Sequence, residues 1–332
     1  RGLGDVAAVV EQLVEPGVDV RDVVALEVVV DIDLPVAGDV VADALVVAVV
    51  PQSAVGAEAG VPMLESGAPA LDAVVAAAKR VGKRATVHVA VDTGMGRFGA
   101  KSAAARKLAE RITQLREVEW AGVMTHFPVA DTDLEYTRTQ WDQFASLLDT
   151  WRRDGIDVPT VHAANSAAIL RLPESHADMV RPGLMLYGMQ PCAECHEARL
   201  RPVLSWVTEV AALHHHTAGD TIGYGRTYHV TRDMHIATLP VGYGDGLAWA
   251  SHNRGYVLIR GIRAPVIGRI SMDQTTVDVS NIPDVTLSDE AVIIGVRGDQ
   301  GISAEQIAEW SGTINYEVTT RLATRVNRVP FS

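Results

Sequence analysis

The segment that most constrains the fold of this chain is residues 161–188, VHAANSAAILRLPESHADMVRPGLMLYG. In it, two apolar, strand-like runs flank a short helical pattern. The first run ends at Ser166, which opens the helix, and the second ends in a Pro-Gly turn after Arg181. A helix start and a glycine turn both present backbone N–H groups, and the helix dipole adds partial positive charge. Such a cradle suits a phosphate group. The simpler alternative is two strand-to-helix turns of an ordinary α/β protein.

Strand and helix patterns alternate up to residue 188. Strands are expected near residues 23–30, 44–50, 85–91 and 118–124, and helices near 6–14, 71–78 and 102–115. Thr132 and Glu135 have the spacing of a capping box. The helix behind them should bury four large side chains, those of Trp141, Phe144, Leu148 and Trp151. This rhythm predicts parallel strands with helical crossovers.

From about residue 205 the pattern changes to short β-rich segments such as YVLIRG, APVIGRI and EAVIIGV, separated by Gly, Pro and Asp. Helical spacing returns near residues 303–310, where Ser303 and Gln306 form another capping-box pattern. We therefore expect an α/β domain over residues 1–200 and a mainly β domain over 201–332.

Several polar residues stand where chemistry is usually placed. Arg97, His126, Ser166 and Arg181 each follow a predicted strand. In a β/α barrel such positions surround the active site. Tyr224 lies between two glycines in the β domain, which should leave its phenol on an exposed turn. The ordinary alternative for Tyr224 is a packing tyrosine in a β-turn.

Composition narrows the function classes. The formal net charge of -12 disfavours nucleic acid and anionic membranes as partners, and no apolar run approaches the roughly 20 residues of a membrane span. No signal peptide is visible, and the only cysteines, Cys192 and Cys195, fit a pair of thiols in a reducing cytoplasm. Their Cys-Ala-Glu-Cys-His spacing also matches c-type haem attachment or half of a zinc site. We favour a solvated linker without metal.

Seven segments occur in the order typical of one enzyme family. They are DTGMGRFG, HAANSAA, MVRPGLMLYG, IGYGRTY, LPVGYGDG, RAPVIGRISMDQ and GTINYEV. Over about residues 80–330 the chain thus resembles alanine racemases, which use pyridoxal 5'-phosphate (PLP). The resemblance implies a (β/α)8-type barrel, here without its first strand, followed by a C-terminal β domain. It also implies interconversion of L- and D-alanine, which supplies D-alanine for peptidoglycan.

The resemblance assigns roles to individual residues. Tyr224 matches the catalytic tyrosine, the base on the L-alanine face, and His126 matches the histidine that links it to Arg181. Arg97 and Met272 match positions near the substrate carboxylate. The residues that match contacts to the cofactor are His126, Asn165, Ser166, Arg181, Gly183, Leu184 and Tyr316. Around them, Tyr243 and Asp273 look like supporting residues.

Two further expectations follow from these matches. Arg181 would face the pyridine nitrogen but cannot protonate it, because a guanidinium keeps its proton in proteins. The tyrosine and the barrel residues lie in different domains, so the resemblance implies a homodimer with shared active sites.

One expected residue is absent. The family's lysine, which binds the cofactor covalently and serves as the second base, has no match among the four lysines, Lys79, Lys83, Lys101 and Lys107. The opening RGLGDV resembles the end of the lysine motif, which would place that lysine four residues before Arg1. We therefore expect the chain as given to be inactive, as a fragment of a complete racemase or as a homologue that has lost catalysis. The alternatives are a racemase of another amino acid, such as serine, and a non-catalytic PLP-binding protein.

Overall fold

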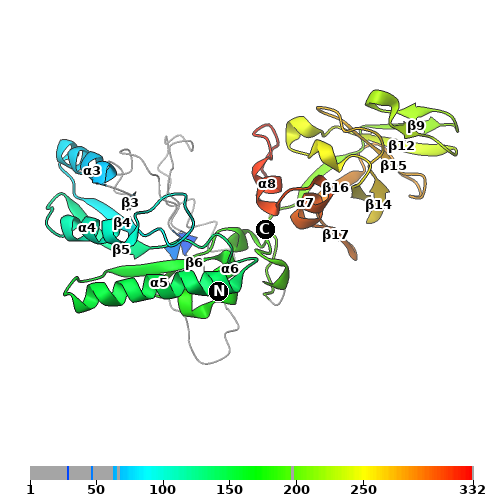
Figure 1. Cartoon of the computed structure of the whole chain (residues 1–332). Coiled ribbons are helices and arrows are strands. Elements are labelled where there is room, and N and C mark those ends of the chain that lie inside the picture. The colour runs from blue at the N-terminus through cyan, green and yellow to red at the C-terminus, as the bar shows by residue number, and fades with distance from the viewer. Residues whose placement is uncertain (1–27, 30–45, 48–62, 66–67, 196–197, 331–332) are drawn as a thin grey trace. The chain divides into compact units, whose positions relative to one another are not determined.

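The computed structural model describes residues 28–29, 46–47, 63–65, 68–195 and 198–330 (Figure 1). The chain divides into two compact units, one made of residues 1–186 and 191–199 and the other of residues 187–190 and 200–332. The predicted helix near residues 6–14 lies outside the described residues. The boundary expected at residue 200 stays a prediction.

A parallel sheet is the centre of the first unit. Its strands are β3 (Met63–Glu65), β4 (Ala85–Ala90), β5 (Val118–Met124), β6 (Thr160–Asn165) and β7 (Met179–Arg181), and they pair in that order. All four pairings are parallel, as the alternating pattern predicts. The described part of β4 is buried at nearly every position, because both faces of such a sheet are covered.

Helices flank this sheet in Figure 1. They are α3 (Ala68–Val81), α4 (Ser102–Ile112), α5 (Leu134–Arg153) and the short α6 (Ser166–Arg171). Helix α5 buries Phe144, Leu148 and Trp151 as predicted, but Trp141 is only half-buried.

The predicted capping box at the start of α5 is wrong by one position. The N-cap is Asp133, whose carboxylate accepts a hydrogen bond from the amide of Tyr136 at 2.9 Å. An aspartate at this position satisfies the same orphan amides as the predicted threonine would, and its charge is favoured by the helix dipole.

The valine-rich segments near the N-terminus form strands of a different kind from those predicted. Strands β1 (Val28–Val29) and β2 (Val46–Val47) pair with each other in antiparallel register. The expectation of parallel strands is therefore wrong for this pair. A valine-rich run has the same composition in either arrangement, so composition does not distinguish them.

The second unit is mainly antiparallel β structure, as predicted. One sheet has the order β15-β12-β9, another has the order β14-β13-β16-β17 with β8 paired to β16, and β10 and β11 form a separate hairpin. The strands are β8 (Trp206–Glu209), β9 (Ala212–His216), β10 (Thr221–Ile222), β11 (Tyr228–His229), β12 (Met234–Leu239), β13 (Tyr256–Ile259), β14 (Ile262–Pro265), β15 (Thr275–Asp278), β16 (Glu290–Arg297) and β17 (Gln300–Ile302).

Two helices complete this unit, α7 (Ala304–Ser311) and α8 (Asn315–Thr320). The predicted capping box at α7 is confirmed, because Ser303 and Gln306 exchange side-chain and backbone hydrogen bonds. Single-turn 3-10 helices connect the larger elements: η2 (Pro173–Ser175), η3 (Leu184–Tyr187), η4 (Ala193–Cys195), η5 (Tyr224–Arg226), η6 (Tyr243–Asp245) and η7 (Trp249–Ser251).

The cysteine pair differs from the expectation. Cys192 and Cys195 form a disulfide with a Cα–Cα distance of 5.2 Å, and Cys195 is only 4% exposed. The prediction of two thiols in a solvated linker is therefore wrong for this structure, because a four-residue turn brings the two sulfur atoms together.

Neither a membrane-spanning helix nor a metal centre is found in the part of the chain that the structure describes. None of its helices combines the length and the apolar character needed to cross a bilayer. Within the same residues, no group of three or more His, Cys, Asp or Glu side chains is arranged to hold a metal ion.

Candidate functional site

Arg181, the last residue of β7, is the centre of a dense hydrogen-bond network in the first unit. Its Nη1 donates to His162 Nδ1 at 2.7 Å. Its Nη2 donates to the carbonyl oxygens of Thr125 at 2.9 Å and Ala163 at 3.0 Å and to His126 Nδ1 at 3.2 Å. These acceptors come from β6 and from the residues that follow β5, so two neighbouring strands fix the guanidinium at the end of a third.

The two histidines around Arg181 are neutral. A guanidinium only donates, so both Nδ1 atoms must accept and each imidazole carries its proton on Nε2. Burial and then the charges of Arg181 and Arg97 lower the pKa of His126 to about 4. Burial, followed by Arg181 and His88, lowers the pKa of His162 to about 2. Burial also lowers the pKa of Arg181 to about 10, which leaves it charged at neutral pH.

The predicted phosphate cradle lies beside this network. Ser166 begins α6, and its Oγ accepts hydrogen bonds from the amides of Gly183 at 2.9 Å and Met185 at 3.5 Å. The sequence predicts unpaired amides here. This expectation is wrong for Gly183 and Met185, because both amides donate to the Ser166 hydroxyl. Leu184, between them, is buried at the start of η3.

Asn165 connects the cradle to the segment that follows β5. Its Oδ1 caps α6 by accepting from the amide of Ala168 at 3.1 Å, and its Nδ2 donates to the carbonyl of Phe127 at 3.1 Å. The side chain therefore connects the end of β6 to the segment that carries His126.

Arg97 lies on a loop that Asp92 organises. The Asp92 carboxylate accepts from the amides of Gly94 at 2.9 Å and Gly96 at 3.0 Å, and from Lys101 at 2.7 Å. Lys101, followed by these backbone contacts, lowers the pKa of Asp92 to about 2. Arg97 itself is exposed, with its guanidinium carbon 5.0 Å from the centre of the Phe98 ring.

The predicted catalytic tyrosine belongs to the second unit. Tyr224 is 71% exposed in η5, between β10 and β11. Gly223 and Gly225 both have φ of 73°, a conformation that glycine adopts without the penalty of a side chain. The two glycines thus present the phenol to solvent, as the sequence predicts.

Other residues predicted for the site lie on exposed loops of the same unit. Met272 and Asp273 are exposed in the turn between β14 and β15, and Tyr243 is exposed in η6. The amide of Tyr243 donates to the carbonyl of Ser271 at 3.0 Å, and that of Gly244 donates to the carbonyl of Met272 at 2.7 Å, so these two loops hold each other. Tyr316 is also exposed, in the first turn of α8.

The predicted residues therefore separate into two groups, one in each unit. In the first unit Arg181 contacts His126, and the amide of Gly183 donates to Ser166. Asn165 contacts Phe127, next to His126, and Ala168 of α6. Within the described residues, no hydrogen bond or ion pair joins a cradle residue to any of the four lysines. Two of these pair elsewhere, Lys79 with Glu117 at 3.2 Å and Lys101 with Asp92.

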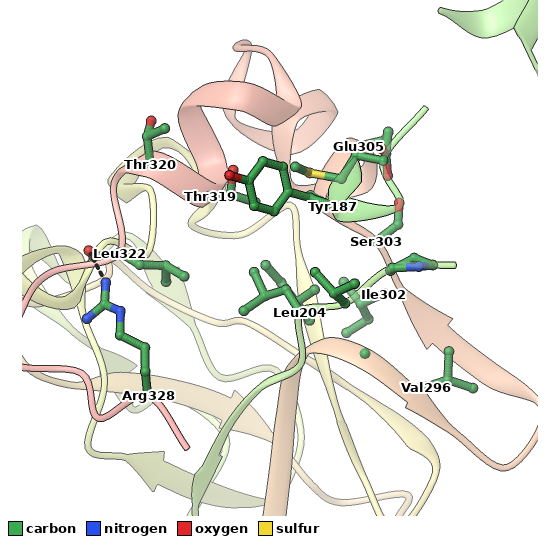
Figure 2. Close-up of a pocket in the computed structure, with 16 residues that line it drawn as sticks. Tyr187, Leu204, Val296, Ile302, Ser303, Glu305, Thr319, Thr320, Leu322 and Arg328 are labelled. Carbon is green, nitrogen blue, oxygen red and sulfur yellow. Dashed lines mark hydrogen bonds between the residues drawn. The ribbon is translucent and has the colours of Figure 1, made fainter. Parts of the chain in front are cut away.

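The second unit contains an apolar hollow of about 470 Å³. Figure 2 shows Leu204, Ile302 and Leu322 among its lining residues, with Glu305 and Arg328 as the charged ones. None of the predicted site residues lines this hollow.

Comparison with protein families gives two matches. The N-terminal domain of alanine racemase matches residues 41–191, and the C-terminal domain of alanine racemase matches residues 203–330. The chain belongs to the alanine racemase family. Both domains occur in the order that the sequence predicts, and the resemblance to alanine racemases is confirmed.

Curated alanine racemases align with most of this chain. It is 46% identical over 244 residues to the alanine racemase of Halothermothrix orenii, an alignment that covers 73% of this chain and 64% of that protein. It is 43% identical over 263 residues to the alanine racemase of Cutibacterium acnes, covering 78% of this chain and 69% of that protein.

Solved alanine racemase structures share the fold. The enzyme from D-cycloserine-producing Streptomyces lavendulae superimposes with a TM-score of 0.79 at 36% identity, covering 85% of this chain and 75% of that one. The Bacillus anthracis enzyme with bound L-Ala-P gives a TM-score of 0.74 at 34% identity, covering 82% of this chain and 71% of that one. A barrel-type α/β domain followed by a β domain is therefore confirmed.

Sequence reasoning missed two residues of the network. His162 opens the HAANSAA motif and His88 lies in β4, and neither was assigned a role. Each is a histidine at a buried position of an otherwise largely apolar strand, and this pattern could have indicated a role for both.

Proposed function

We propose that this protein is a PLP-dependent racemase that interconverts L- and D-alanine. The observation that carries the proposal is Arg181, a charged donor held by residues of two neighbouring strands next to the cradle of Ser166 and Gly183. Together they offer a phosphate site and a non-acidic partner for a pyridine nitrogen on one edge of one sheet.

The residues fit PLP in two respects. A Cβ added to Gly183 would meet no atom within 4 Å, so the backbone beside the Ser166 hydroxyl is open to a ligand. Arg181 uses Nη1 and Nη2 for its protein contacts, and among the described residues its Nε–H has no acceptor. That N–H is the donor that would face the pyridine nitrogen. Since Arg181 stays protonated, it would hold the nitrogen without giving it a proton.

Bound PLP supplies an electron sink that makes the α-proton of an amino acid acidic. Tyr224 would take up or return that proton on one face of the substrate. A neutral His126 accepts from Arg181 at Nδ1, which leaves its Nε2–H to donate to the phenolic oxygen. Arg97 and the backbone of Met272 would bind the substrate carboxylate.

Exposed side chains of the second unit support a homodimer with shared sites. Tyr224, Met272, Tyr243 and Tyr316 are large and exposed in that unit. Large apolar side chains that stay exposed are typical of a surface that another chain covers. We propose that the second unit covers the barrel mouth of a second copy, which would place Tyr224 next to the partner's cofactor. We also place the protein in the cytoplasm, which the resemblance to alanine racemases implies.

The test uses the protein produced from its own gene. L-alanine, D-alanine and L-serine are each incubated with it and PLP, and both enantiomers are quantified by chiral chromatography. Racemisation of alanine in both directions, faster than that of serine, supports the proposal. PLP binding without turnover would favour a non-catalytic homologue, and preferred turnover of serine would favour the other racemase. Borohydride reduction followed by peptide mapping then identifies the lysine, and we expect no label on Lys79 or Lys101.

A further inference from the structure

We propose that His88 and His162 form a relay of two neutral imidazoles that positions Arg181, and that Gly122 allows this relay to cross strand β5. The proposal rests on the proposed function, because Arg181 is the residue that would face the cofactor's pyridine nitrogen. It deepens that function by assigning positioning roles to three buried residues behind the site.

The relay is a continuous series of short contacts. Arg181 Nη1 lies 2.7 Å from His162 Nδ1, and His162 Nε2 lies 2.7 Å from His88 Nδ1. Because Arg181 has only donors, it sets the direction of the whole series. His162 accepts at Nδ1 and donates from Nε2, and His88 accepts at Nδ1 and carries its own proton on Nε2.

No other proton arrangement preserves both contacts. A proton on His162 Nδ1 would face a guanidinium N–H, and a proton on His88 Nδ1 would face the N–H of His162. Both rings are buried, with His162 3% and His88 8% exposed, so bulk water cannot readily replace a lost partner. Burial and then the charge of Arg181 lower the pKa of His88 to about 4, which agrees with a neutral ring.

Gly122 is what makes the contact between the histidines possible. His88 lies on β4 and His162 on β6, and β5 runs between them. In the β4–β5 pairing, His88 is the direct register partner of Gly122. A Cβ added to Gly122 would lie 2.3 Å from His88 Nδ1 and 2.5 Å from its Cε1. The missing side chain therefore leaves the path along which His88 reaches His162.

The reason for glycine here is steric and not conformational. Gly122 is not among the glycines with positive φ, so its backbone is open to other residues. The atom that an added Cβ would meet is the one that accepts the hydrogen bond from His162. An alanine would displace that ring from the relay while leaving the strand conformation permitted.

Neutral imidazoles suit the proposed task of Arg181. No hydrogen bond or ion pair joins Arg181 to a carboxylate in the part of the chain that the structure describes. Imidazoles and carbonyls thus hold the guanidinium without cancelling its charge. His162 fixes Nη1, while the Thr125 and Ala163 carbonyls fix Nη2, and among the described residues no acceptor holds Nε.

The direct test is nitrogen NMR of the full chain labelled with 15N-histidine, without cofactor, between pH 6 and 8. The 11 histidines are assigned by single substitutions. We expect both His162 and His88 to show an unprotonated Nδ1 and a protonated Nε2, each as one fixed tautomer. A protonated Nδ1 on either ring would overturn the proposal.

Variants separate positioning from packing. Gly122→Ala should displace the His88 and His162 signals and weaken PLP binding by up to about tenfold, the effect of losing one hydrogen bond between neutral groups. The double variant Gly122→Ala with His88→Ala removes the clash with the ring but keeps the contact of the added Cβ with the Thr160 carbonyl oxygen at 2.8 Å, so its melting temperature should recover only in part. PLP binding should not recover in it, whereas His162 should keep its tautomer, which Arg181 sets. His176→Ala, which removes another histidine contact in the same unit, serves as the matched control and should leave both unchanged.

Two outcomes of the variant series would reject the relay. One is a His88→Ala variant in which PLP binding keeps its strength. The other is recovery of PLP binding in the double variant, which would mean that Gly122 serves packing alone. The NMR readout needs neither cofactor nor turnover, so a protein that binds no PLP would refute the proposed function and still leave the relay tested.

Discussion

The hydroxyl groups of Thr93 and Thr125 lie 2.7 Å apart, and this contact ties the loop that carries Arg97 to the end of strand β5. Thr125 Oγ1 donates to the carbonyl of Val91 at 2.9 Å, so Thr93 is the donor to Thr125. Gln140 Nε2 from α5 adds a hydrogen bond to Thr93 at 3.3 Å. Since the Thr125 carbonyl also accepts from Arg181, one residue joins the Arg97 loop to the guanidinium network.

Replacing Thr93 with valine should weaken substrate binding more than catalysis. The change keeps the side-chain shape but removes the donor to Thr125, so the Arg97 loop is less well held. We expect KM for alanine to rise several-fold with kcat nearly unchanged, and stability to fall by about 1 kcal/mol. Steady-state kinetics and urea unfolding measure the two effects. Thr139→Val, which removes an exposed hydroxyl contact on α5, is the control and should change neither. A fall in kcat as large as the rise in KM would contradict the assignment of Thr93 to substrate binding.

Replacing Ser166 with alanine should weaken PLP binding. The hydroxyl is buried and accepts from the amide of Gly183, so its loss leaves a cradle amide unpaired and removes the proposed phosphate contact. We expect at least tenfold weaker PLP binding in an absorbance titration. Ser175→Ala is the matched control, because that buried hydroxyl donates to the carbonyl of Leu172 outside the cradle. Similar PLP affinity in the two variants would argue against the cradle.

Replacing Tyr224 with phenylalanine should abolish most of the turnover. Removal of a positioned acid–base group typically costs about 10²–10⁴-fold in rate. Because Tyr224 is exposed and supports no packing, the melting temperature should stay within about 1 °C of the parent's. Tyr228→Phe is the control in the same hairpin, since that phenol contacts Met234 Sδ at 3.8 Å. Near-normal racemisation by the Tyr224 variant would exclude it as the base.

Stability of the first unit should fall as the pH drops from about 6.5 to 4. Burial is the first cause that lowers the pKa of His88 and His126 to about 4 and that of His162 to about 2. In the unfolded chain these rings titrate near pH 6.5, so over this window the unfolded state binds more protons. The stability that these neutral histidines contribute is therefore complete above about pH 6.5. It is lost as the pH falls through their pKa values in the folded state.

Over this window the free energy of unfolding should fall by about 1 kcal/mol per pH unit for each histidine. The fall should be smaller for the partly exposed His126. Urea unfolding at a series of pH values measures it. The variant His88→Ala should show a shallower slope than the parent, by about one proton. Parallel slopes in the two proteins would show that His88 does not stay neutral in the folded state.

The sequence by itself determined those features that depend on local chemistry. Glycines on both sides of Tyr224 require an exposed turn, and the Ser303–Gln306 spacing forms its capping box with residues three positions apart. Alternating apolar patterns predict the parallel strands, and ordered motifs in both halves identify the family. Each of these signals lies within a few residues of the structure that it predicts.

Only the tertiary structure decided contacts between distant segments. His88, Gly122 and His162 are each more than thirty positions apart in the sequence, and only the pairing of β4, β5 and β6 aligns them. The same holds for Arg181, whose partners come from the ends of different strands. Hydrogen-bond direction and burial, which make both histidines neutral, depend on the packed sheet because a charged donor and a dry interior exist only once the chain has folded.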